Sequence, residues 1–342
     1  MKSVIMRKYN IPIFVPHKGC PFDCVFCNQN RITGSLKEVT PEDVTNTIED
    51  YLKTLPKNDR KIEVAFFGGS FTGIPIDEQS LLMERVSPYI KSGIIDGIRL
   101  STRPDYISNE ILDNLKQYGV TTIELGVQSM ADSVLMASNR GHTRETVKKA
   151  VALIRNYDFS LGLQMMTGLP GDTDELSLET AGELIKLKPD FVRIYPTLTI
   201  KDTYLEKLYK LGKYKPQELD NAVVLAKKLL IMFEKANIDV IRIGLQPTEE
   251  INSDASVVAG PFHSSFGELV ESSIYYDIIK EKAMGIGDDV TIFVNPREIS
   301  KAVGNKRSNI LKLKEELGIN IKIKGDTSLE RREVRADVVK KT

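Results

Sequence analysis

Three cysteines are the residues best suited to chemistry, because they are the only cysteines in the 342-residue chain and they lie close together. Cys20, Cys24 and Cys27 follow a C-x3-C-x2-C spacing. An odd, clustered set is a poor disulfide framework and is typical of metal ligation. Three thiolates can hold an iron–sulfur cubane and leave its fourth iron open, whereas His17 with the same thiolates would make a Cys3His zinc site. Taken alone, the spacing leaves both interpretations open.

The elements that must position these cysteines are predicted from six apolar runs that alternate with helical patterns. The runs are Ile11–Pro16, Ile62–Phe67, Gly97–Ser101, Thr121–Gly126, Ser160–Met166 and Phe191–Pro196. Their near-continuous apolar character predicts parallel strands covered on both faces. Thr40-Pro41 marks one helix start between them, with an N-cap residue before a proline. The predicted fold class is α/β, a partial (β/α)6 TIM-type barrel with its chemistry at the carboxyl ends of the strands.

The bulk composition is that of a globular protein, with 41% hydrophobic and 27% charged residues. Forty-seven Lys/Arg balance 47 Asp/Glu, and this zero net charge argues against a uniformly basic nucleic-acid binder. The N-terminal segment is too polar for a signal peptide, and no apolar run reaches the ~18 residues of a membrane-spanning helix. We therefore expect a cytoplasmic protein without a membrane partner.

Phe26 stands directly before the last cysteine, and with this aromatic residue the cysteine segment resembles the signature of the radical S-adenosylmethionine (SAM) superfamily. The resemblance implies one [4Fe–4S] cluster on Cys20, Cys24 and Cys27, with the open iron chelated by the amine and carboxylate of S-adenosyl-L-methionine. It also implies an electron donor, such as flavodoxin or ferredoxin. One electron would cleave SAM to methionine and a 5′-deoxyadenosyl radical, so the protein itself supplies position and shielding.

The same resemblance implies contacts to SAM in the cysteine segment and at the ends of strands two to five. These residues are Phe26, Gly68, Gly69, Ser70, Ser101, Arg103, Glu124, Gln128, Arg140, Gln164 and Gly168. Gln128 and Arg140 match positions that contact the sugar and the methionyl carboxylate, and Gln164 stands where related oxidases have an acid that contacts the sugar. Ser101 replaces a common glutamate. A second interpretation gives Glu124 only a salt bridge to Arg103. No catalytic residue is assigned.

The segments Arg103–Tyr106 and Asn139–Thr143 resemble most specifically the catalytic subunit of Elongator, a radical SAM protein that modifies wobble uridine in tRNA. More distantly, the chain resembles oxygen-independent coproporphyrinogen oxidase. The expected function is therefore radical modification of RNA, in particular tRNA, in a chain too short for Elongator's acetyltransferase domain. Two alternatives stay open: a radical SAM enzyme acting on a small metabolite, and a zinc-stabilised RNA-binding protein.

The predicted domains are residues 1–210, the barrel; 211–289, an α/β extension; and 290–342, a small basic module. From Lys301 onward 12 Lys/Arg face 6 Asp/Glu, and the order is strand, helix, helix, strand. This part resembles a KH RNA-binding module, although its Gly304–Arg307 loop lacks the second glycine. We expect Lys306 and Arg307 to contact RNA phosphates. A module that merely covers the barrel is the alternative, and the Gly260–Gly267 loop receives no role.

Overall fold

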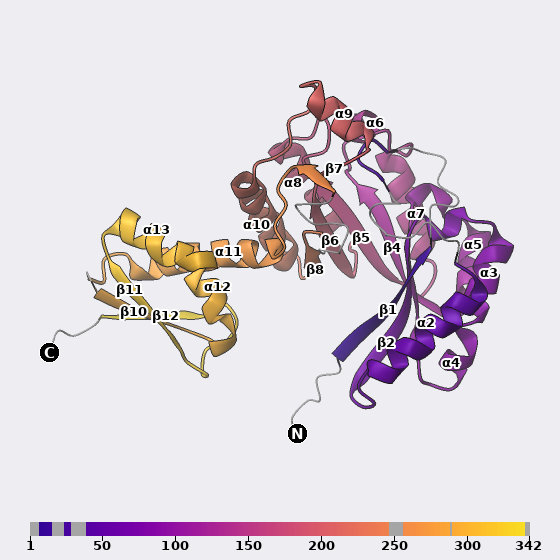
Figure 1. Ribbon diagram of the computed structural model, residues 1–342, viewed down its shortest axis with the longest axis horizontal. Coiled ribbons are helices and arrows are strands. Elements are labelled where there is room, and N and C mark those ends of the chain that lie inside the picture. The colour runs from indigo at the N-terminus through magenta and orange to yellow at the C-terminus, as the bar shows by residue number, and fades with distance from the viewer. Residues whose placement is uncertain (1–6, 16–23, 29–38, 246–255, 288, 339–342) are drawn as a thin grey trace.

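A curled sheet of seven parallel strands forms the larger part of the molecule (Figure 1). The computed structural model describes residues 7–15, 24–28, 39–245, 256–287 and 289–338. The strands follow the order β1-β2-β3-β4-β5-β6-β8. The prediction of an α/β, partial TIM-type barrel is therefore confirmed, and β8 adds a seventh strand to the six expected units.

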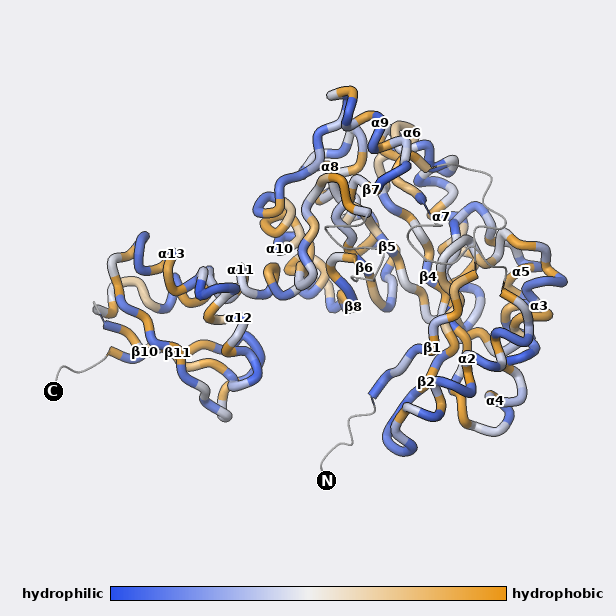
Figure 2. Tube along the Cα trace, viewed as in Figure 1, coloured by the Kyte–Doolittle hydropathy of each residue, from blue (hydrophilic) through white to orange (hydrophobic). Residues whose placement is uncertain are grey.

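The strands of this sheet are β1 (Arg7–Val15), β2 (Arg60–Gly68), β3 (Gly97–Thr102), β4 (Val120–Gln128), β5 (Ser160–Thr167), β6 (Phe191–Pro196) and β8 (Asp239–Ile243). Apolar segments recur along each of them (Figure 2). A short antiparallel pair is formed by β7 (Thr199–Ile200) and β9 (Val257–Ala259).

Helices connect the strands and cover the outer face of the curl. They are α2 (Pro41–Thr54), α3 (Ile76–Glu84), α4 (Ser87–Lys91), α5 (Asn109–Gln117), α6 (Asp132–Ala137), α7 (Arg144–Ile154), α8 (Asp174–Lys186), α9 (Tyr204–Lys210) and α10 (Leu219–Lys235). The predicted start of α2 is confirmed: the Thr40 hydroxyl accepts from the Asp43 amide, and the Asp43 carboxylate accepts from the Thr40 amide.

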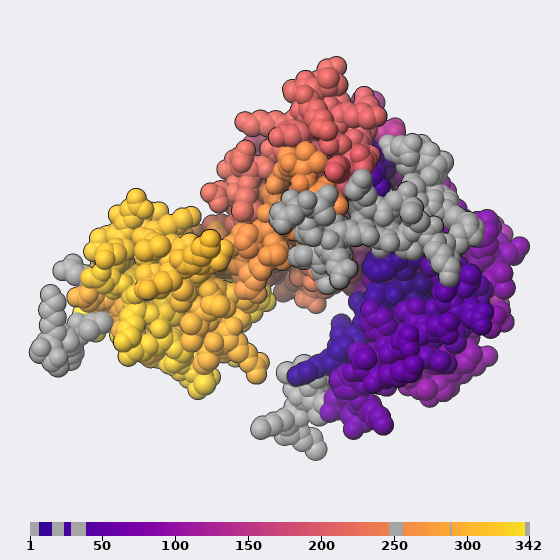
Figure 3. Space-filling model, viewed as in Figure 1, coloured from indigo at the N-terminus to yellow at the C-terminus, as the bar shows by residue number. Residues whose placement is uncertain are grey.

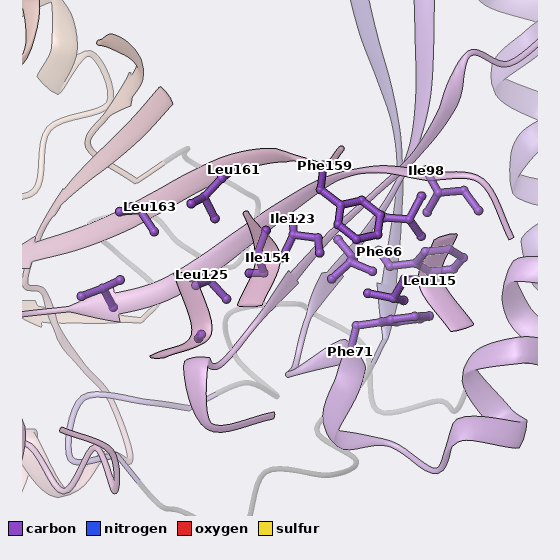
Figure 4. Packing of buried hydrophobic residues seen from close by; sticks show 14 of the residues in the cluster. Phe66, Phe71, Ile98, Leu115, Ile123, Leu125, Ile154, Phe159, Leu161 and Leu163 are labelled. Carbon is purple, nitrogen blue, oxygen red and sulfur yellow. The ribbon is translucent and has the colours of Figure 1, made fainter. Parts of the chain in front are cut away.

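The hydrophobic core lies between the sheet and these outer helices. Phe66 stacks on Phe71 with ring centroids 4.6 Å apart, and Ile98, Ile123 and Leu161 from neighbouring strands pack into the same cluster (Figure 4). Side chains alternate along a strand, so the residues between these apolar ones face the inside of the curl. That inner face is polar on several strands. Within the described ranges, the apolar packing against helices is thus found on the outer face, and the expectation of apolar cover on both faces holds for that face but not for the polar inner one.

The C-terminal module stands on the long helix α11 (Phe266–Ala283) and projects from the barrel (Figures 1 and 3). Its elements are β10 (Asp289–Val294), α12 (Ile299–Val303), α13 (Ser308–Leu317), β11 (Asn320–Gly325) and β12 (Val334–Val338). The central strand β10 pairs with β11 in parallel and with β12 antiparallel. Buried apolar residues of this sheet, α11, α12 and α13 form a second core.

Among the described helices, none combines the length and the apolar character needed to cross a membrane.

Candidate functional site

We call residues 24–28, which include Cys24 and Cys27, the cysteine loop. This loop is held by two elements that lie far apart in the sequence. Cys24 is buried and Cys27 half-buried, and the Cys27 amide donates to the Cys24 carbonyl oxygen at 2.9 Å. The Val25 amide donates to the Ser138 carbonyl oxygen just after α6 (3.1 Å), and the Val25 carbonyl oxygen accepts from the Leu205 amide in α9 (2.7 Å). The loop is thus held from both sides at the carboxyl edge of the sheet.

Arg140 joins this loop to the sheet. Its Nη1 lies 3.5 Å from the Cys24 Sγ, and its Nη2 donates to the Gly126 carbonyl oxygen at 2.6 Å. A Cβ atom at Gly126 would lie 2.8 Å from that Nη2, so glycine lets the guanidinium lie against the end of β4. The Arg140 Nε is buried without a hydrogen-bond partner in the described part of the chain. A positive charge with an unused donor therefore stands beside Cys24, where an anionic group can bind.

Two glutamines meet at the ends of β4 and β5. Gln128 has a φ of +69°, and the pairing of the two strands shifts register between Gly126 and Gln128. Such a bulge re-aims a side chain, and bulges are common beside active sites. The Gln164 Nε2 donates to the Gln128 Oε1 at 3.3 Å. The structure thus brings together two predicted residues whose amides can hydrogen-bond the hydroxyl groups of a sugar.

The Gly-Gly turn after β2 ties three strand ends together. Gly68 ends β2, and the Gly69 amide donates to the Val15 carbonyl oxygen at the end of β1 (3.0 Å). The buried Ser70 hydroxyl lies 2.8 Å from the Thr102 hydroxyl at the end of β3. It also accepts from the Arg103 amide at 3.1 Å. These bonds hold the carboxyl ends of β1, β2 and β3 at fixed spacing.

Arg103 braces Arg140 from within the protein. Its Nε and Nη2 donate to the two carboxylate oxygens of Asp105 at 2.9 and 2.8 Å. Its Nη2 also donates to the Arg140 carbonyl oxygen at 2.7 Å, and only 3% of the residue is exposed. Bidentate pairing of this kind fixes the guanidinium plane. Arg103 is therefore placed to position Arg140.

His142 is buried next to this brace. Its Nε2 donates to the Val127 carbonyl oxygen at 3.2 Å, while its Nδ1 has no partner in the described region. Burial, with the positive charge of Arg140 as a second cause, lowers the pKa of His142 to about 4. A neutral imidazole therefore fills this position at neutral pH.

Glu124 belongs to a charged row on the inner face of the sheet. Its carboxylate accepts from Arg99 and from Arg193, each at 3.1 Å. The interpretation that pairs Glu124 with Arg103 is therefore wrong, because Arg103 lies at the strand end and is held by Asp105. Arg193 reaches Glu124 across β5, where a Cβ at Gly162 would meet the Glu124 side chain at 3.1 Å.

The sequence analysis did not single out Arg99 or Arg193. Each alternates with apolar residues, in β3 and β6 respectively, and this alternation indicates that both lie on the inner face of the sheet. Ser101 lies half-buried beside the row, in register with Glu124.

Tyr214, also missed, links the Gly168 turn to the cysteine loop. Its hydroxyl donates to the Gly168 carbonyl oxygen at 2.7 Å, and its ring packs with Val25 and Leu205, with Phe26 at the margin of this cluster. Burial raises the pKa of Tyr214, so the phenol keeps its proton and remains a donor. No local pattern around Tyr214 indicated this role, because Gly168 and Val25 come from two segments that are distant in the sequence.

The Gly260–Gly267 loop lies beside the ends of β6 and β8. Its residues Phe262 and His263 line a small hollow together with Pro196 from β6. This places the loop at the same edge of the sheet as the cysteine loop.

A cluster and SAM can be tested against these side chains. Cys20 and His17 lie outside the described residues, and within the described ranges no group of three His, Cys, Asp or Glu side chains could hold a metal. Cys24 and Cys27 fit a thiolate-held cluster, because both lie at the carboxyl edge of the sheet, one buried and one half-buried. The unpartnered Nε of Arg140 beside Cys24 fits an anionic carboxylate. The residues present therefore agree with both groups.

Comparisons with known proteins agree with this geometry. The family model "Radical SAM superfamily" matches residues 14–184, and the model "Radical_SAM C-terminal domain" matches residues 189–276. Elongator complex protein 3 of Dictyostelium discoideum is 31% identical over 203 residues, covering 54% of this chain and 36% of that protein. A tRNA uridine(34) acetyltransferase of Methanocaldococcus infernus is 26% identical over 295 residues, covering 76% of this chain and 54% of that protein.

The fold is also shared with a solved structure. The archaeal Methanocaldococcus infernus Elp3, with residues 1–46 deleted, superposes with a TM-score of 0.60 and 23% identity, covering 81% of this chain and 64% of that chain. The chain thus spans between about a third and about a half of the length of the curated relatives described above. Since the first family model alone matches half of the chain, and the strand ends carry the fitting side chains, the protein belongs to the radical SAM superfamily of enzymes.

Proposed function

We propose that Cys20, Cys24 and Cys27 hold one [4Fe–4S] cluster, and that SAM binds to its open iron between Arg140, Gln128 and Gln164. The observation that carries this proposal is the contact of Arg140 with Cys24, because it joins the cysteine loop to the strand ends. When bound and reduced, the cluster supplies one electron that cleaves SAM to methionine and a 5′-deoxyadenosyl radical. The expected setting is the cytoplasm, where thiols stay reduced.

The chain's own residues bind, orient and shield. Arg140 holds the methionyl carboxylate through a charge-assisted hydrogen bond, and Arg103 fixes its backbone. Gln128 and Gln164 orient the sugar. The packed ring of Tyr214 and its neighbour Val25 close the loop on one side, which excludes water from the radical. None of these residues needs to donate a proton to SAM or to remove one from it.

We further propose that the substrate is RNA, and in particular tRNA. The names of the relatives support this substrate class. The loop between α12 and α13 supports it physically, because Lys306 and Arg307 are both exposed at its tip. Both residues have left-handed backbone conformations, with φ of +50° and +64°. Two exposed cations on a tight turn can contact consecutive phosphates.

The cluster is tested by anaerobic reconstitution. We expect a brown protein with about four irons. Changing all three cysteines to alanine should abolish the colour, because no other thiol exists in the chain. The reconstituted parent should release 5′-deoxyadenosine from SAM when reduced. A colourless protein with one tightly bound zinc would contradict the cluster.

The RNA substrate is tested by filter binding of tRNA at two salt concentrations. The parent should bind tRNA, with an affinity that falls steeply as salt rises, because phosphate contacts release counterions. The double change Lys306→Glu/Arg307→Glu should weaken binding to many RNA sequences about equally, while SAM cleavage stays at the parental rate. Lys322→Glu/Lys324→Glu, on β11 of the same module, is the control of equal charge. If the parent does not bind tRNA at low salt, a small-metabolite substrate takes the place of RNA.

A further inference from the structure

The segment from Lys201 to Lys215 covers the cysteine loop from outside. The Leu205 amide donates to the Val25 carbonyl oxygen at 2.7 Å, and the Asn28 side-chain amide donates to the Lys201 carbonyl oxygen at 3.3 Å. Leu205 and Tyr214 also pack on Val25 in one buried cluster. This segment is therefore a direct structural link between the cysteine loop and the surface.

The outward side of this segment is both cationic and apolar. Residues 201–215 contain five lysines and two acids, and one of these acids, Glu206, is buried and paired with Lys210 at 2.8 Å. The five lysines are all exposed: Lys201, Lys207, Lys210, Lys213 and Lys215. Among them Tyr204 is 58% and Leu211 68% exposed. We call the exposed side chains of residues 201–215 the α9 patch; it stands at the top of the molecule in Figure 3, and Figure 2 shows hydrophilic and hydrophobic segments interleaved there.

Another helix, α6, carries an exposed apolar side chain near the same part of the cysteine loop. Met136 of α6 is 80% exposed and lies two residues before Ser138, whose carbonyl oxygen accepts from the Val25 amide. Tyr204 precedes Leu205, which donates to the other side of Val25. Large exposed apolar side chains that gather at one place mark a site of interaction. Val25 is thus bonded to the segments of two separate helices, α6 and α9, that carry these exposed side chains.

The composition favours a protein partner over RNA. Every cation of the α9 patch is lysine, whereas arginine is the residue whose planar fork suits phosphate best. Tyr204 and Tyr209 carry rings on which a base could stack, but Met136 and Leu211, the two most exposed apolar side chains here, carry none and are of a kind that is buried well in protein interfaces. Surplus positive charge around an apolar centre attracts an acidic protein surface and speeds its encounter.

We propose that the α9 patch is the docking surface for an acidic one-electron carrier protein of the flavodoxin or ferredoxin class. This inference rests on the proposed cluster. In the complex one electron would pass from the carrier, which is oxidised, to the cluster that the cysteines would hold, which is reduced, and no covalent bond forms or breaks. A transient interface of this kind is small and depends on charge, so it dissociates readily after the transfer.

The test compares one protein donor with one small chemical reductant. The probe is a flavodoxin of negative net charge, and its affinity in the oxidised form is measured by calorimetry at low and high salt. The variant Lys207→Glu/Lys213→Glu should weaken flavodoxin binding at least tenfold at low salt. It should also raise the flavodoxin concentration needed for half-maximal 5′-deoxyadenosine formation. With dithionite, which needs no docking surface, its rate should stay within twofold of the parental rate.

Two further variants sharpen the result. Lys322→Glu/Lys324→Glu makes the same charge change on β11 and should bind flavodoxin as the parent does. Leu211→Gln should weaken binding without changing its salt dependence, because it removes apolar area and no charge. Parental flavodoxin affinity in Lys207→Glu/Lys213→Glu would overturn the proposal. So would a parent that binds no flavodoxin, or a patch variant that loses tRNA binding instead. Failure of the cluster itself is distinguishable, because the parent would then be colourless and inactive with dithionite.

Discussion

At the scale of single residues, Arg140 makes contacts that no one segment of the chain could supply. It reaches the Cys24 sulfur, the Gly126 carbonyl oxygen at the end of β4, and, through its own carbonyl oxygen, Arg103. One guanidinium donor remains buried without a partner in the described part of the chain. An unsatisfied buried donor is costly, so a bound anion would stabilise this arrangement.

Arg140→Ala should therefore weaken SAM binding by roughly 1.5–3 kcal/mol, or about 10- to 150-fold, the loss expected for one charge-assisted hydrogen bond. Calorimetry with the reconstituted enzyme measures this affinity, and the unfolding temperature shows that the variant is folded. Arg144→Ala, which removes an exposed arginine paired with Asp132, is the control and should bind SAM as the parent does. An Arg140→Ala protein with parental SAM affinity would refute the contact.

His142 gives a prediction about pH. Its pKa is about 4 in the folded protein against about 6.5 when unfolded, so the unfolded chain binds more protons between these values. The free energy of unfolding should then fall by up to roughly 3 kcal/mol as pH drops from about 6.5 to about 4. His142→Gln, which keeps a donor for the Val127 carbonyl oxygen, should flatten this part of the curve. Chemical denaturation at several pH values measures it, and identical slopes for parent and variant would exclude His142 as the cause.

At the scale of elements, the turn between α12 and α13 has a left-handed backbone at Arg307, where glycine would be favoured. Gly304 ends α12 with a φ of +79°, and Arg307 has a φ of +64°. The second glycine of the resembled motif is thus absent from the sequence, while its position still has a left-handed backbone. Asn309 supports the turn, because its Nδ2 donates to the Ser272 and Ala302 carbonyl oxygens at 2.9 and 3.1 Å.

Arg307→Gly should therefore stabilise the protein by about 1 kcal/mol, because a non-glycine residue in the left-handed region costs about that much. The same change should weaken tRNA binding, since it removes a cation from the exposed tip. Thermal unfolding and filter binding measure the two effects. Asn305→Gly is the control in the same turn: its φ is not positive, so glycine there brings no gain. A less stable Arg307→Gly protein would show that the arginine side chain itself supports the turn.

At the scale of the whole molecule, two neighbouring arginines, Arg331 and Arg332, join the C-terminal module to the barrel, and both pair with Glu234 and Glu271. Arg332, between β11 and β12, pairs with Glu271 of α11 at 2.9 Å and with Glu234 of α10. Its amide donates to the buried Tyr275 hydroxyl at 3.0 Å. Because α10 follows β6 and packs on the barrel core, this network sets how the module sits on the barrel.

The double change Arg331→Gln/Arg332→Gln should loosen the module without disturbing the barrel, because it leaves two partly buried carboxylates, Glu234 and Glu271, without the two cations that they share. Limited proteolysis should release a C-terminal fragment earlier, and SAM cleavage should stay at the parental rate. Arg335→Gln is the matched control, since Arg335 pairs with Asp326 and Asp337 of its own module and does not contact the barrel through these pairs. Equal proteolysis of both variants would show that the apolar contacts of α11 alone hold the module.

The amino-acid sequence alone predicts three candidate metal ligands and the repeating strand–helix order, and the structure confirms the strand–helix order. Both are local: cysteine spacing shows which thiols can share one cluster, and apolar runs such as Phe191–Pro196 show where the chain is buried. The strand β6 begins and ends at the same residues as that predicted run. The shared sheet edge follows as well, since parallel strands connected by helices place their carboxyl ends together.

Which polar residues meet depends on the tertiary structure. The sequence allowed a salt bridge between Glu124 and Arg103, but Glu124 pairs with Arg99 and Arg193 instead. It does so because these side chains lie on the same face of the sheet and Gly162 leaves room above β5. Tyr214 reaches the cysteine loop only because the chain returns across the strand ends after β6. Such contacts join residues far apart in sequence, and their geometry depends on sheet curl and register, which no local pattern encodes.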